Sequence, residues 1–323
     1  MVTSALEFET DRRLLWGLCY RMTGNAADAD DLVQETFVKV LEKPPRRLDQ
    51  PLRPWLIRVA INLSRDLLRR RKRRGYTGEW LPSPVPTDDN DSPASYEPPA
   101  PSEDSPVARY DMLESISFAF LLALEALTPS QRAVLLLRDV FDYSTSEVAT
   151  AMEITENSAK VLLHRARGRM RDYDKERAIP DAVRSEATRR ALEQFLLCLK
   201  NRDVEGLEKL LTADVVSISD GGGEVAAALR PIKGRDRVIR LMTGLAEKAG
   251  PMPKVSFRLL NGWPAMSVEV EEQDRRPGVA SRFTMHFEVD ISGRIRRLDT
   301  VAAPSKLSAL PGEESANLAN RYE

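Results

Sequence analysis

The residues best suited to chemistry by type and spacing lie in a stretch between Ser146 and Arg171. The second half of this stretch has five bases and no acid, namely Lys160, Arg165, Arg167, Arg169 and Arg171. Cationic side chains gathered on one short segment neutralise the phosphates of a nucleic acid and release its counterions. The chemistry indicated here is the binding of a polyanion.

Acid–base catalysis is the alternative chemistry. A proton-transfer site needs titratable groups that converge in one place. The candidates are Asp214, Asp220, Asp299 and His286. His286 alternates with apolar neighbours, which is typical of a polar sheet residue with a satisfied hydrogen bond, and Asp220 precedes three glycines as a turn former does. We predict no catalytic residue and no enzymatic activity.

The two cysteines, Cys19 and Cys198, lie far apart inside apolar helical patterns. Buried free thiols fit this placement better than a disulfide or a metal site. The sequence therefore predicts no metal ligand and no cofactor.

The charge of the chain is unevenly distributed, although its formal net value is -1. Residues 1–74 carry 16 Lys and Arg against 10 Asp and Glu, a net of +6. Residues 75–112 carry 1 Lys or Arg against 8 Asp and Glu, a net charge of -7, and are dense in proline and serine. Such a composition buries too little apolar area to offset its ordering entropy, so 75–112 is predicted to be an extended acidic linker.

Residues 1–74 are predicted to be helical. In "DADDLVQETFVKVLEK" the apolar positions recur at helical spacing, and three aspartates crowd the first turn, where the helix dipole favours acids. An ordinary amphipathic helix and a partner surface both fit this pattern. The next helix, "RPWLIRVAINLSRDLLRRRKRR", ends in six consecutive bases, and the charge of this block favours phosphate contacts over a merely solvated helix end.

Residues 113–178 form a second helical block. Thr128-Pro129 begins a helix with proline in its first turn. A short helix around Val148, a turn anchored by Ile154 and a longer helix from Asn157 to Met170 follow. This order is the plan of a helix-turn-helix, whose second helix enters the major groove. A plain helical hairpin is the alternative, and the basic second helix favours DNA.

Residues 185–305 are predicted to form an α+β domain. Two helices lead to a strand that ends at Asp220, and a third helix over 234–250 is followed by four strands of alternating polarity. Residues 306–323 are predicted to be a flexible tail.

The two helical blocks resemble regions 2 and 4 of an extracytoplasmic-function (ECF) RNA polymerase sigma factor over residues 5–175. The matching runs, in order, are "DADDLVQETF", "PWLIRVAINLSRDLLRRRKRR", "LTPSQRAVLLLRDVF" and "SEVATAMEITENSAKVLLHRAR". The resemblance implies an all-α region 2 bundle over 1–74 and an all-α region 4 helix-turn-helix over 113–178. One departure is Glu153, where family members often have glycine at the turn.

The resemblance also implies binding residues. Core polymerase would be bound through Asp31, Leu32, Val33, Gln34, Glu35 and Phe37. Region 2 would contact promoter DNA through Arg58, Asn62, Arg65, Arg69 and Arg70. Region 4 would contact a more distant promoter element through Asn157, Ser158, Lys160, Val161, His164, Arg165 and Arg167.

The C-terminal domain resembles the SnoaL-like, nuclear transport factor 2-like fold, a cone with a central pocket. The whole chain resembles the ECF subgroup in which this domain is fused, the sigma factor J type. That resemblance implies a regulatory interdomain contact through Trp80, Leu81, Pro82, Asp220, Gly221, Gly222, Gly223, Pro304, Lys306 and Leu307. The run "APSKL" departs from the usual Asn-Pro-Asp-Lys-Leu, and Glu224 replaces a usual basic residue.

These motifs predict a sigma factor that binds core RNA polymerase and promoter DNA, directs promoter-specific initiation, and is regulated in cis by its C-terminal domain. The alternatives are a small-molecule enzyme tethered to DNA and a ligand sensor, either of which would use the cone pocket; the identity of any small ligand is open. No signal peptide and no membrane-spanning run is recognised, which predicts a cytoplasmic protein without a membrane partner.

Overall fold

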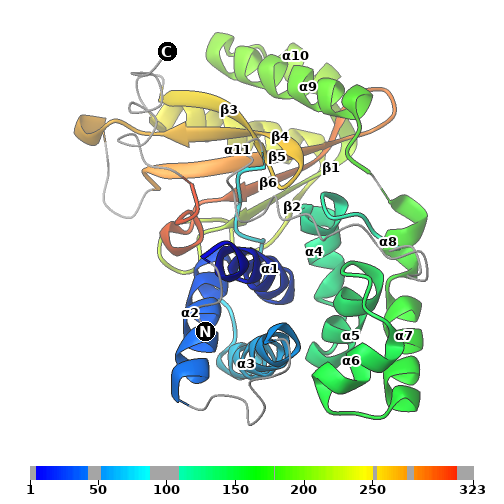
Figure 1. The fold of residues 1–323 in the computed structure, drawn as a ribbon. Coiled ribbons are helices and arrows are strands. Elements are labelled where there is room, and N and C mark those ends of the chain that lie inside the picture. Colours follow the sequence, from blue (N-terminus) through cyan, green and yellow to red (C-terminus); the bar gives the residue numbers. More distant parts are fainter. Residues whose placement is uncertain are drawn as a thin grey trace. The chain divides into compact units, whose positions relative to one another are not determined.

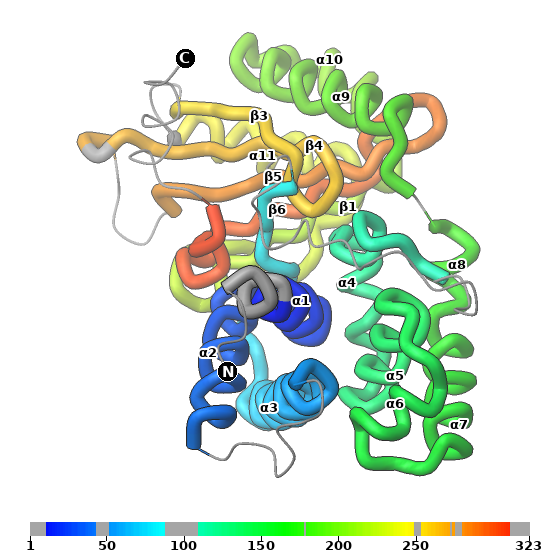
Figure 2. The backbone as a smooth tube through the Cα atoms, viewed as in Figure 1, coloured from blue at the N-terminus to red at the C-terminus, as the bar shows by residue number. Residues whose placement is uncertain are grey.

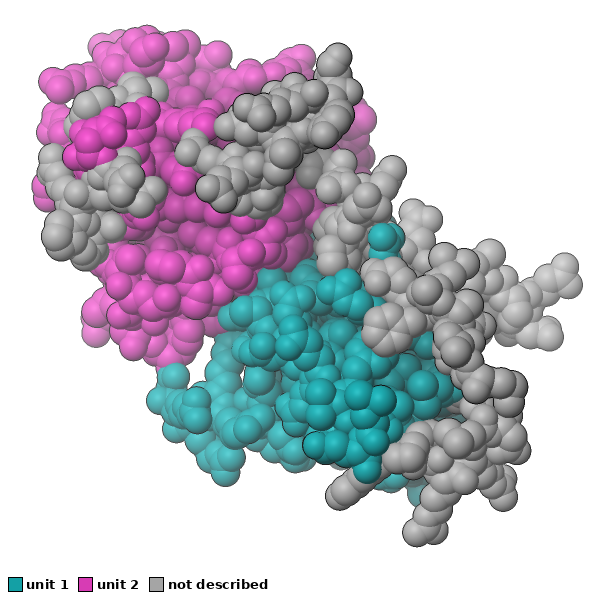
Figure 3. Space-filling model, turned by 60° about the vertical axis from the view of Figure 1, so that its left-hand side comes forward, with its two compact units in different colours: residues 1–75, 89–179 teal, residues 76–88, 180–323 magenta. Residues whose placement is uncertain are grey.

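The computed structural model describes residues 5–42, 52–87, 109–177, 179–249, 253–274 and 280–310. The chain divides into two compact units, coloured separately in Figure 3. The first unit holds residues 1–75 and 89–179, and the second holds residues 76–88 and 180–323. Within the described ranges, no helix is long and apolar enough to cross a membrane.

This division differs from the prediction of one linker over 75–112. Residues 76–88 belong to the second unit, and the chain from residue 89 belongs to the first. Residues 88–108, the centre of the predicted linker, lie outside the described residues. Tyr110, near its end, is fully buried, and its ring packs against Phe120 with 4.9 Å between ring centroids. Aromatic burial therefore extends the second helical block backwards to residue 110.

The first unit begins with a bundle of three helices, drawn in blue in Figure 1. They are α1 (Ala5–Thr23), α2 (Ala26–Glu42) and α3 (Arg53–Arg74). Their fully or almost fully buried side chains include Leu15, Tyr20, Leu32, Ile57 and Ile61. Burying one large aliphatic side chain contributes roughly 1.5–3 kcal/mol, so the packing of these apolar stripes holds the bundle together.

The second helical block contains the short turn η2 (Glu114–Ile116) and the helices α4 (Phe118–Leu124), α5 (Pro129–Asp139), α6 (Thr145–Met152), α7 (Glu156–Arg169) and α8 (Arg171–Glu176). Local side chains determine where these helices begin. Capping boxes start α5 and α6, pairing Thr128 with Gln131 and Ser144 with Glu147. Thr155 caps α7 by accepting a hydrogen bond from the Ser158 backbone N–H at 3.1 Å.

Two buried arginines join the bundle to the later helices within the first unit. Arg21 of α1 is fully buried and donates from Nε to Ser115 Oγ at 2.7 Å and from Nη2 to the Met112 carbonyl at 2.9 Å. Arg132 of α5 donates from Nη1 to the Met22 carbonyl at 2.6 Å. Burial lowers the pKa of Arg21 to about 9. Losing either guanidinium would strand buried acceptors, at about 1–3 kcal/mol each.

The second unit is an α+β domain built on a six-stranded sheet of order β2-β1-β6-β5-β4-β3. Its strands are β1 (Leu211–Asp220), β2 (Ile232–Lys233), β3 (Lys254–Leu260), β4 (Trp263–Glu269), β5 (Arg282–Val289) and β6 (Ile295–Val301). Its helices are α9 (Ala182–Asn201), α10 (Val204–Leu210) and α11 (Arg235–Ala249), with short turns η3 (Glu272–Asp274) and η4 (Pro304–Lys306). β1 is parallel to β6, and the other strand pairs are antiparallel.

The helices cover one face of this sheet, with α9 on β4 and β5 and α11 on β1. The core between them includes Phe195, Met242, Met266, Phe287 and Leu298. Phe195 and Phe287 meet edge to face, with ring centroids 5.0 Å apart. The interior of the predicted cone is therefore lined with apolar side chains. The helical regions and this α+β domain confirm the fold class predicted from the sequence.

The C-terminal residues depart from the prediction of a flexible tail over 306–323. Lys306, Leu307 and Leu310 are 3%, 5% and 5% exposed, because η4 turns the chain back onto the second unit. Residues 311–323 lie outside the described residues. At the other boundary α9 begins at Ala182, ahead of the predicted start at residue 185, since Asp181 caps the helix.

Candidate nucleic-acid interface and the Asp220 cluster

The helix-turn-helix consists of α6 and α7, joined by a turn at Glu153. Glu153 adopts the left-handed conformation with φ of 54°. That conformation favours glycine and costs other residues about 1–2 kcal/mol, which explains why glycine suits this turn. The turn closes through the Ile154 backbone N–H, which donates to the Ala149 carbonyl at 3.0 Å.

The outward face of α7 carries most of the residues predicted to contact DNA. Asn157, Ser158, Lys160, Val161, His164 and Arg165 are all exposed. Ala159 and Ala166 are buried on the opposite side, where α7 packs against α5 and α6. Lys160 and Arg165 form no ion pair within the described part of the chain. Their charges are therefore available to phosphates or base edges.

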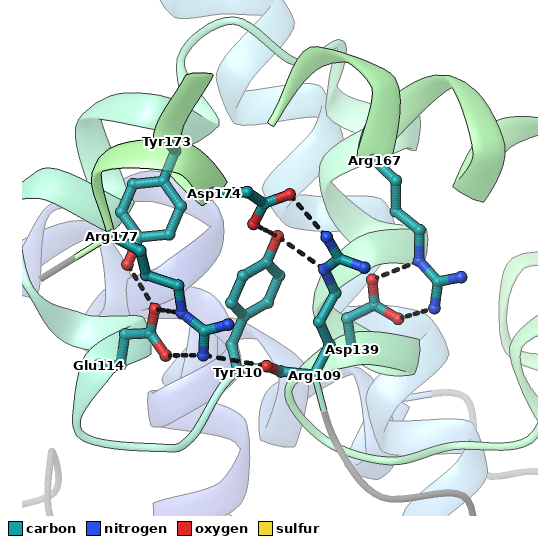
Figure 4. Close-up of polar contacts among 8 residues, drawn as sticks. All are labelled: Arg109, Tyr110, Glu114, Asp139, Arg167, Tyr173, Asp174 and Arg177. Atoms are coloured by element: carbon teal, nitrogen blue, oxygen red, sulfur yellow. Dashed lines mark hydrogen bonds and ion pairs between the residues drawn. The ribbon is translucent and has the colours of Figure 1, made fainter. Parts of the chain in front are cut away.

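Arg167, also predicted to contact DNA, is held instead by Asp139 of α5. Its Nε and Nη2 donate to the two carboxylate oxygens at 2.8 and 2.6 Å (Figure 4). Asp139 is 2% exposed, so this bidentate pair is shielded on the carboxylate side. The side chain of Arg167 therefore positions α7 on α5, and its contact with DNA stays a prediction.

The same view shows how residues 109–114 are tied to α8 (Figure 4). Tyr110 Oη donates to Asp174 at 2.8 Å. Glu114, fully buried, accepts hydrogen bonds from Tyr173 Oη at 2.7 Å and from Nε and Nη2 of Arg177. Burial raises the pKa of Tyr110 and of Tyr173. Sequence reasoning missed this network, although an aromatic residue next to the only base of an acidic segment was an available signal.

The predicted DNA face of α3 presents a row of cations. Asn62, Arg69 and Arg70 are exposed, while Arg58 and Arg65 are half-buried. Arg58 Nη1 pairs with Glu153 Oε1 of the helix-turn-helix at 3.0 Å. Burial, followed by the charge of Arg69, lowers the pKa of Arg65, whose Nε has no hydrogen-bond partner among the described residues. Crowded cations of this kind are stabilised by a nearby anion.

Two of the residues predicted to dock on polymerase are core residues of the bundle. Leu32 and Val33 are 2% and 4% exposed, because their side of α2 packs against α1 and α3. Asp31, Gln34 and Glu35 are exposed, and Phe37 is half-buried. The outer face of α2 is therefore largely polar. It continues into two exposed apolar side chains that the predicted set lacks, Val38 and Leu41.

The residues predicted to form the regulatory contact meet inside the second unit, around Asp220 at the end of β1. Asp220 is 1% exposed. Its Oδ1 accepts from Tyr76 Oη at 2.6 Å, and its Oδ2 accepts from the Leu81 backbone N–H at 2.8 Å and from Lys306 Nζ at 2.6 Å. Lys306 Nζ also donates to the Leu81 carbonyl and lies 4.7 Å from the ring centroid of Trp80. We call these five residues the Asp220 cluster.

The cluster fastens residues 76–87 to the domain, and Figure 2 traces this segment in cyan. Beyond Leu81, Val85 and Asn261 exchange hydrogen bonds at 2.9 Å each, and the Thr87 backbone N–H donates to the Leu259 carbonyl at 2.9 Å. A short antiparallel bridge joins Pro86 to Leu260, the last residue of the edge strand β3. The segment thus pairs with the sheet edge as an added strand does.

The glycines after Asp220 allow this close approach. Gly222 has φ of 62°, and a Cβ there would lie 2.9 Å from the Ala303 Cβ. Gly221 and Gly223 flank it, and Pro304 and Leu307 lie in and after η4. Glu224 accepts from the Ser305 hydroxyl and backbone N–H. The acid at this position therefore binds η4, and the loop presents no anion site there.

The acid–base candidates do not converge on one pocket. Asp214 is exposed, and Asp220 belongs to the cluster described above. His286 and Asp299 are register partners on β5 and β6, on the sheet face opposite the apolar core. Burial lowers the pKa of His286 to about 3 and raises that of Asp299 to about 6, against the effect of Arg297. His286 Nε2 lies 3.4 Å from Thr284 Oγ1.

Comparison with known proteins agrees with the two helical regions described above. Residues 8–74 match the Sigma-70 region 2 family, and residues 117–170 match the Sigma-70, region 4 family. The chain is 30% identical over 313 residues to the ECF RNA polymerase sigma factor SigJ of Mycobacterium tuberculosis, covering 95% of this chain and 94% of that protein. It is 26% identical over 306 residues to the probable ECF RNA polymerase sigma factor SigI of the same organism, covering 94% of each.

Among solved structures, the crystal structure of the Mycobacterium tuberculosis extracytoplasmic function sigma factor SigJ is similar, with a TM-score of 0.70 and 27% identity. The similarity covers 95% of this chain and 99% of that one, so it includes both helical blocks and the α+β domain. The chain belongs to the ECF family of RNA polymerase sigma factors.

Proposed function

We propose that this chain binds core RNA polymerase and directs transcription from specific promoters. The observation that carries the proposal is the exposed face of α7, which presents Asn157, Lys160, His164 and Arg165 behind a capped turn. An asparagine pairs with adenine and an arginine with guanine in the major groove, while a lysine neutralises phosphate. α7 would read one promoter element, and the cations of α3 would hold a second.

The outer face of α2 is the proposed contact with core polymerase. Asp31, Gln34 and Glu35 supply polar and acidic groups, and Val38 and Leu41 supply apolar area that is 48% and 83% exposed. Exposed aliphatic side chains beside charged ones suit a protein interface better than free solvent. Leu32 and Val33 would act only by holding α2 in place.

Runoff transcription with core polymerase across a promoter library tests this function. We expect promoter-specific transcripts that are weakened by Lys160→Ala on α7. Arg190→Ala removes an exposed cation on α9 and is the matched control. Failure to produce a specific transcript at any promoter, with a folded chain that binds core, would contradict the assignment.

We infer in addition that the C-terminal domain regulates initiation in cis. The Asp220 cluster holds residues 76–87, which begin directly after Gly75 at the end of α3. The domain is thus attached to the chain at two places, by this segment and by the connection before α9. Double attachment keeps it at high effective concentration near the helical regions.

This regulatory proposal is tested by comparing runoff transcription from three forms at equal concentration: full-length, ending at Val301, and ending at residue 179. Removing the residues after Val301 takes away Lys306, and we expect it to release the segment and raise promoter output. Equal output from all three forms would show that the domain has no regulatory role.

A further inference from the structure

An open hollow on the second unit lies outside all the sites described above. It lies at the edge strand β2 and the first half of α11, and its volume is about 420 Å³. Its lining residues are Pro231, Ile232, Lys233, Arg237 and Arg240. An adjoining hollow of about 220 Å³ shares Lys233 and Arg237 and adds Arg235 and Asp236. Four cations therefore line the joined space, against one acid.

The chain does not neutralise these cations. The side chains of Lys233, Arg237 and Arg240 form no hydrogen bond or ion pair with any residue that the structure describes. Elsewhere in the same unit arginines are paired, as Arg189 is with Glu186 and Arg294 with Asp290. Unpaired like charges facing one space repel each other, and that repulsion is relieved when an anion enters.

The placement of the cations on α11 adds a second, independent indication. The first turn of a helix is electropositive, so cations are unfavourable there, yet Arg235 and Arg237 lie in it with Asp236 between them. Nε of Arg235 is buried and has no hydrogen-bond partner among the described residues, while its Nη1 donates to the Glu208 carbonyl at 3.1 Å. Sites that break local rules of stability are often functional.

We propose that this hollow binds a small molecule carrying a phosphate group. Arg237 and Arg240 are three residues apart and lie on one side of α11, so both guanidinium groups can bind one phosphate with paired hydrogen bonds. Lys233 adds a point charge from β2. Lys233 comes from β2 and Arg237 and Arg240 from α11, and the meeting of two elements at one hollow favours a compact anion over an extended one.

The experiment is calorimetric titration of the full chain with pyrophosphate at low ionic strength. We expect saturable binding at one site, and a Kd at least about tenfold higher for Arg237→Gln with Arg240→Gln, because charge-assisted hydrogen bonds are lost. The control is Lys200→Gln with Lys248→Gln, which removes the same charge at exposed positions of α9 and the far end of α11. We expect the control to bind as the parent does, with thermal unfolding confirming that all three proteins are folded.

Two outcomes would overturn the proposal. Absence of saturable pyrophosphate binding to the parent chain is one, and an equal loss of affinity in both double variants is the other, because it would show a general charge effect. A second arm uses duplex DNA without a promoter. If the Arg237 and Arg240 variant loses affinity for this duplex while pyrophosphate fails to bind the parent, the hollow serves DNA and the small-ligand proposal is wrong.

Discussion

Replacing Asp220 by asparagine should release residues 76–87 from the C-terminal domain. Oδ2 of Asp220 accepts from both the Leu81 backbone N–H and Lys306 Nζ, and Lys306 is 3% exposed. An amide offers one acceptor oxygen and no charge. The variant therefore removes the carboxylate that pairs with this buried ammonium, and the segment loses the group that joins it to β1.

The expected cost follows from this geometry. Removing one partner of a buried ion pair destabilises a protein by about 3–5 kcal/mol. The aromatic rings of Tyr76 and Trp80, 4.8 and 4.7 Å from Lys306 Nζ, contact the ammonium in both proteins and so do not change this cost. A loss of about 3–5 kcal/mol lowers the Tm of the second unit by on the order of 10 °C.

Hydrogen exchange measures the release directly. The amides of Leu81, Val85 and Thr87 donate to Asp220, Asn261 and Leu259, so their protection should fall about a hundredfold if the segment opens.

Two further variants separate charge from shape. Glu224→Gln changes an exposed carboxylate bonded to Ser305, and we expect little effect. Asp220→Asn combined with Lys306→Met removes both charges of the buried pair and should recover part of the stability. Unchanged Tm and unchanged Leu81 protection in Asp220→Asn would refute the reasoning.

Four other substitutions give equally distinct outcomes. Leu32→Ala should lower the free energy of unfolding by about 2–5 kcal/mol, because a 2%-exposed side chain leaves a cavity; a denaturant midpoint equal to that of the parent would contradict its core position. Arg165→Ala should weaken DNA binding by about 1–3 kcal/mol if Arg165 contacts a base, and should leave the fold intact. Arg167→Ala should instead lower stability, because it removes the pair with Asp139. DNA titration and thermal unfolding separate the two effects, and the reverse pattern would refute these roles of Arg165 and Arg167. Burial lowers the pKa of His286 from 6.5 to about 3, so the folded state binds fewer protons than the unfolded state between these values, and stability falls as the pH drops below about 6.5. Asp299, with its pKa raised to about 6, has the opposite effect, so Asp299→Asn should steepen the fall in Tm from pH 6.5 to pH 4, and a pH-independent Tm in that variant would contradict the buried position of His286.

Sequence reasoning was strongest where the signal is local. The capping pairs Thr128 with Gln131 and Ser144 with Glu147 lie three residues apart, so the starts of α5 and α6 could be expected from short motifs. The alternation of β5 likewise separates His286 from Phe287, as the sheet faces confirm. The meeting of Trp80, Asp220 and Lys306 came from a family resemblance, since no periodicity relates positions so far apart.

Sequence reasoning was weakest on the direction that a side chain takes and on its distant partner. Helical spacing puts Leu32 on an apolar stripe, but a stripe faces a neighbouring helix or a partner protein equally well. Only the packing of α2 on α1 and α3 shows that Leu32 is internal. Composition likewise assigned residues 76–87 to the linker, because hydrogen bonds to a distant sheet edge leave no trace in composition.

The sequence by itself determined the order of the domains, the helix-turn-helix and the uneven distribution of charge. Each of these features is recognised from residues that lie close together in the sequence. Tertiary structure alone decided which charges are free. Arg165 and Arg167 are alike in the sequence, yet Arg167 meets Asp139, 28 positions away, and Arg165 meets no counter-charge among the described residues. Lys306 is likewise buried against Asp220, 86 positions away. A charge that folding pairs internally stabilises the fold, and a charge left unpaired at the surface is available to bind a partner.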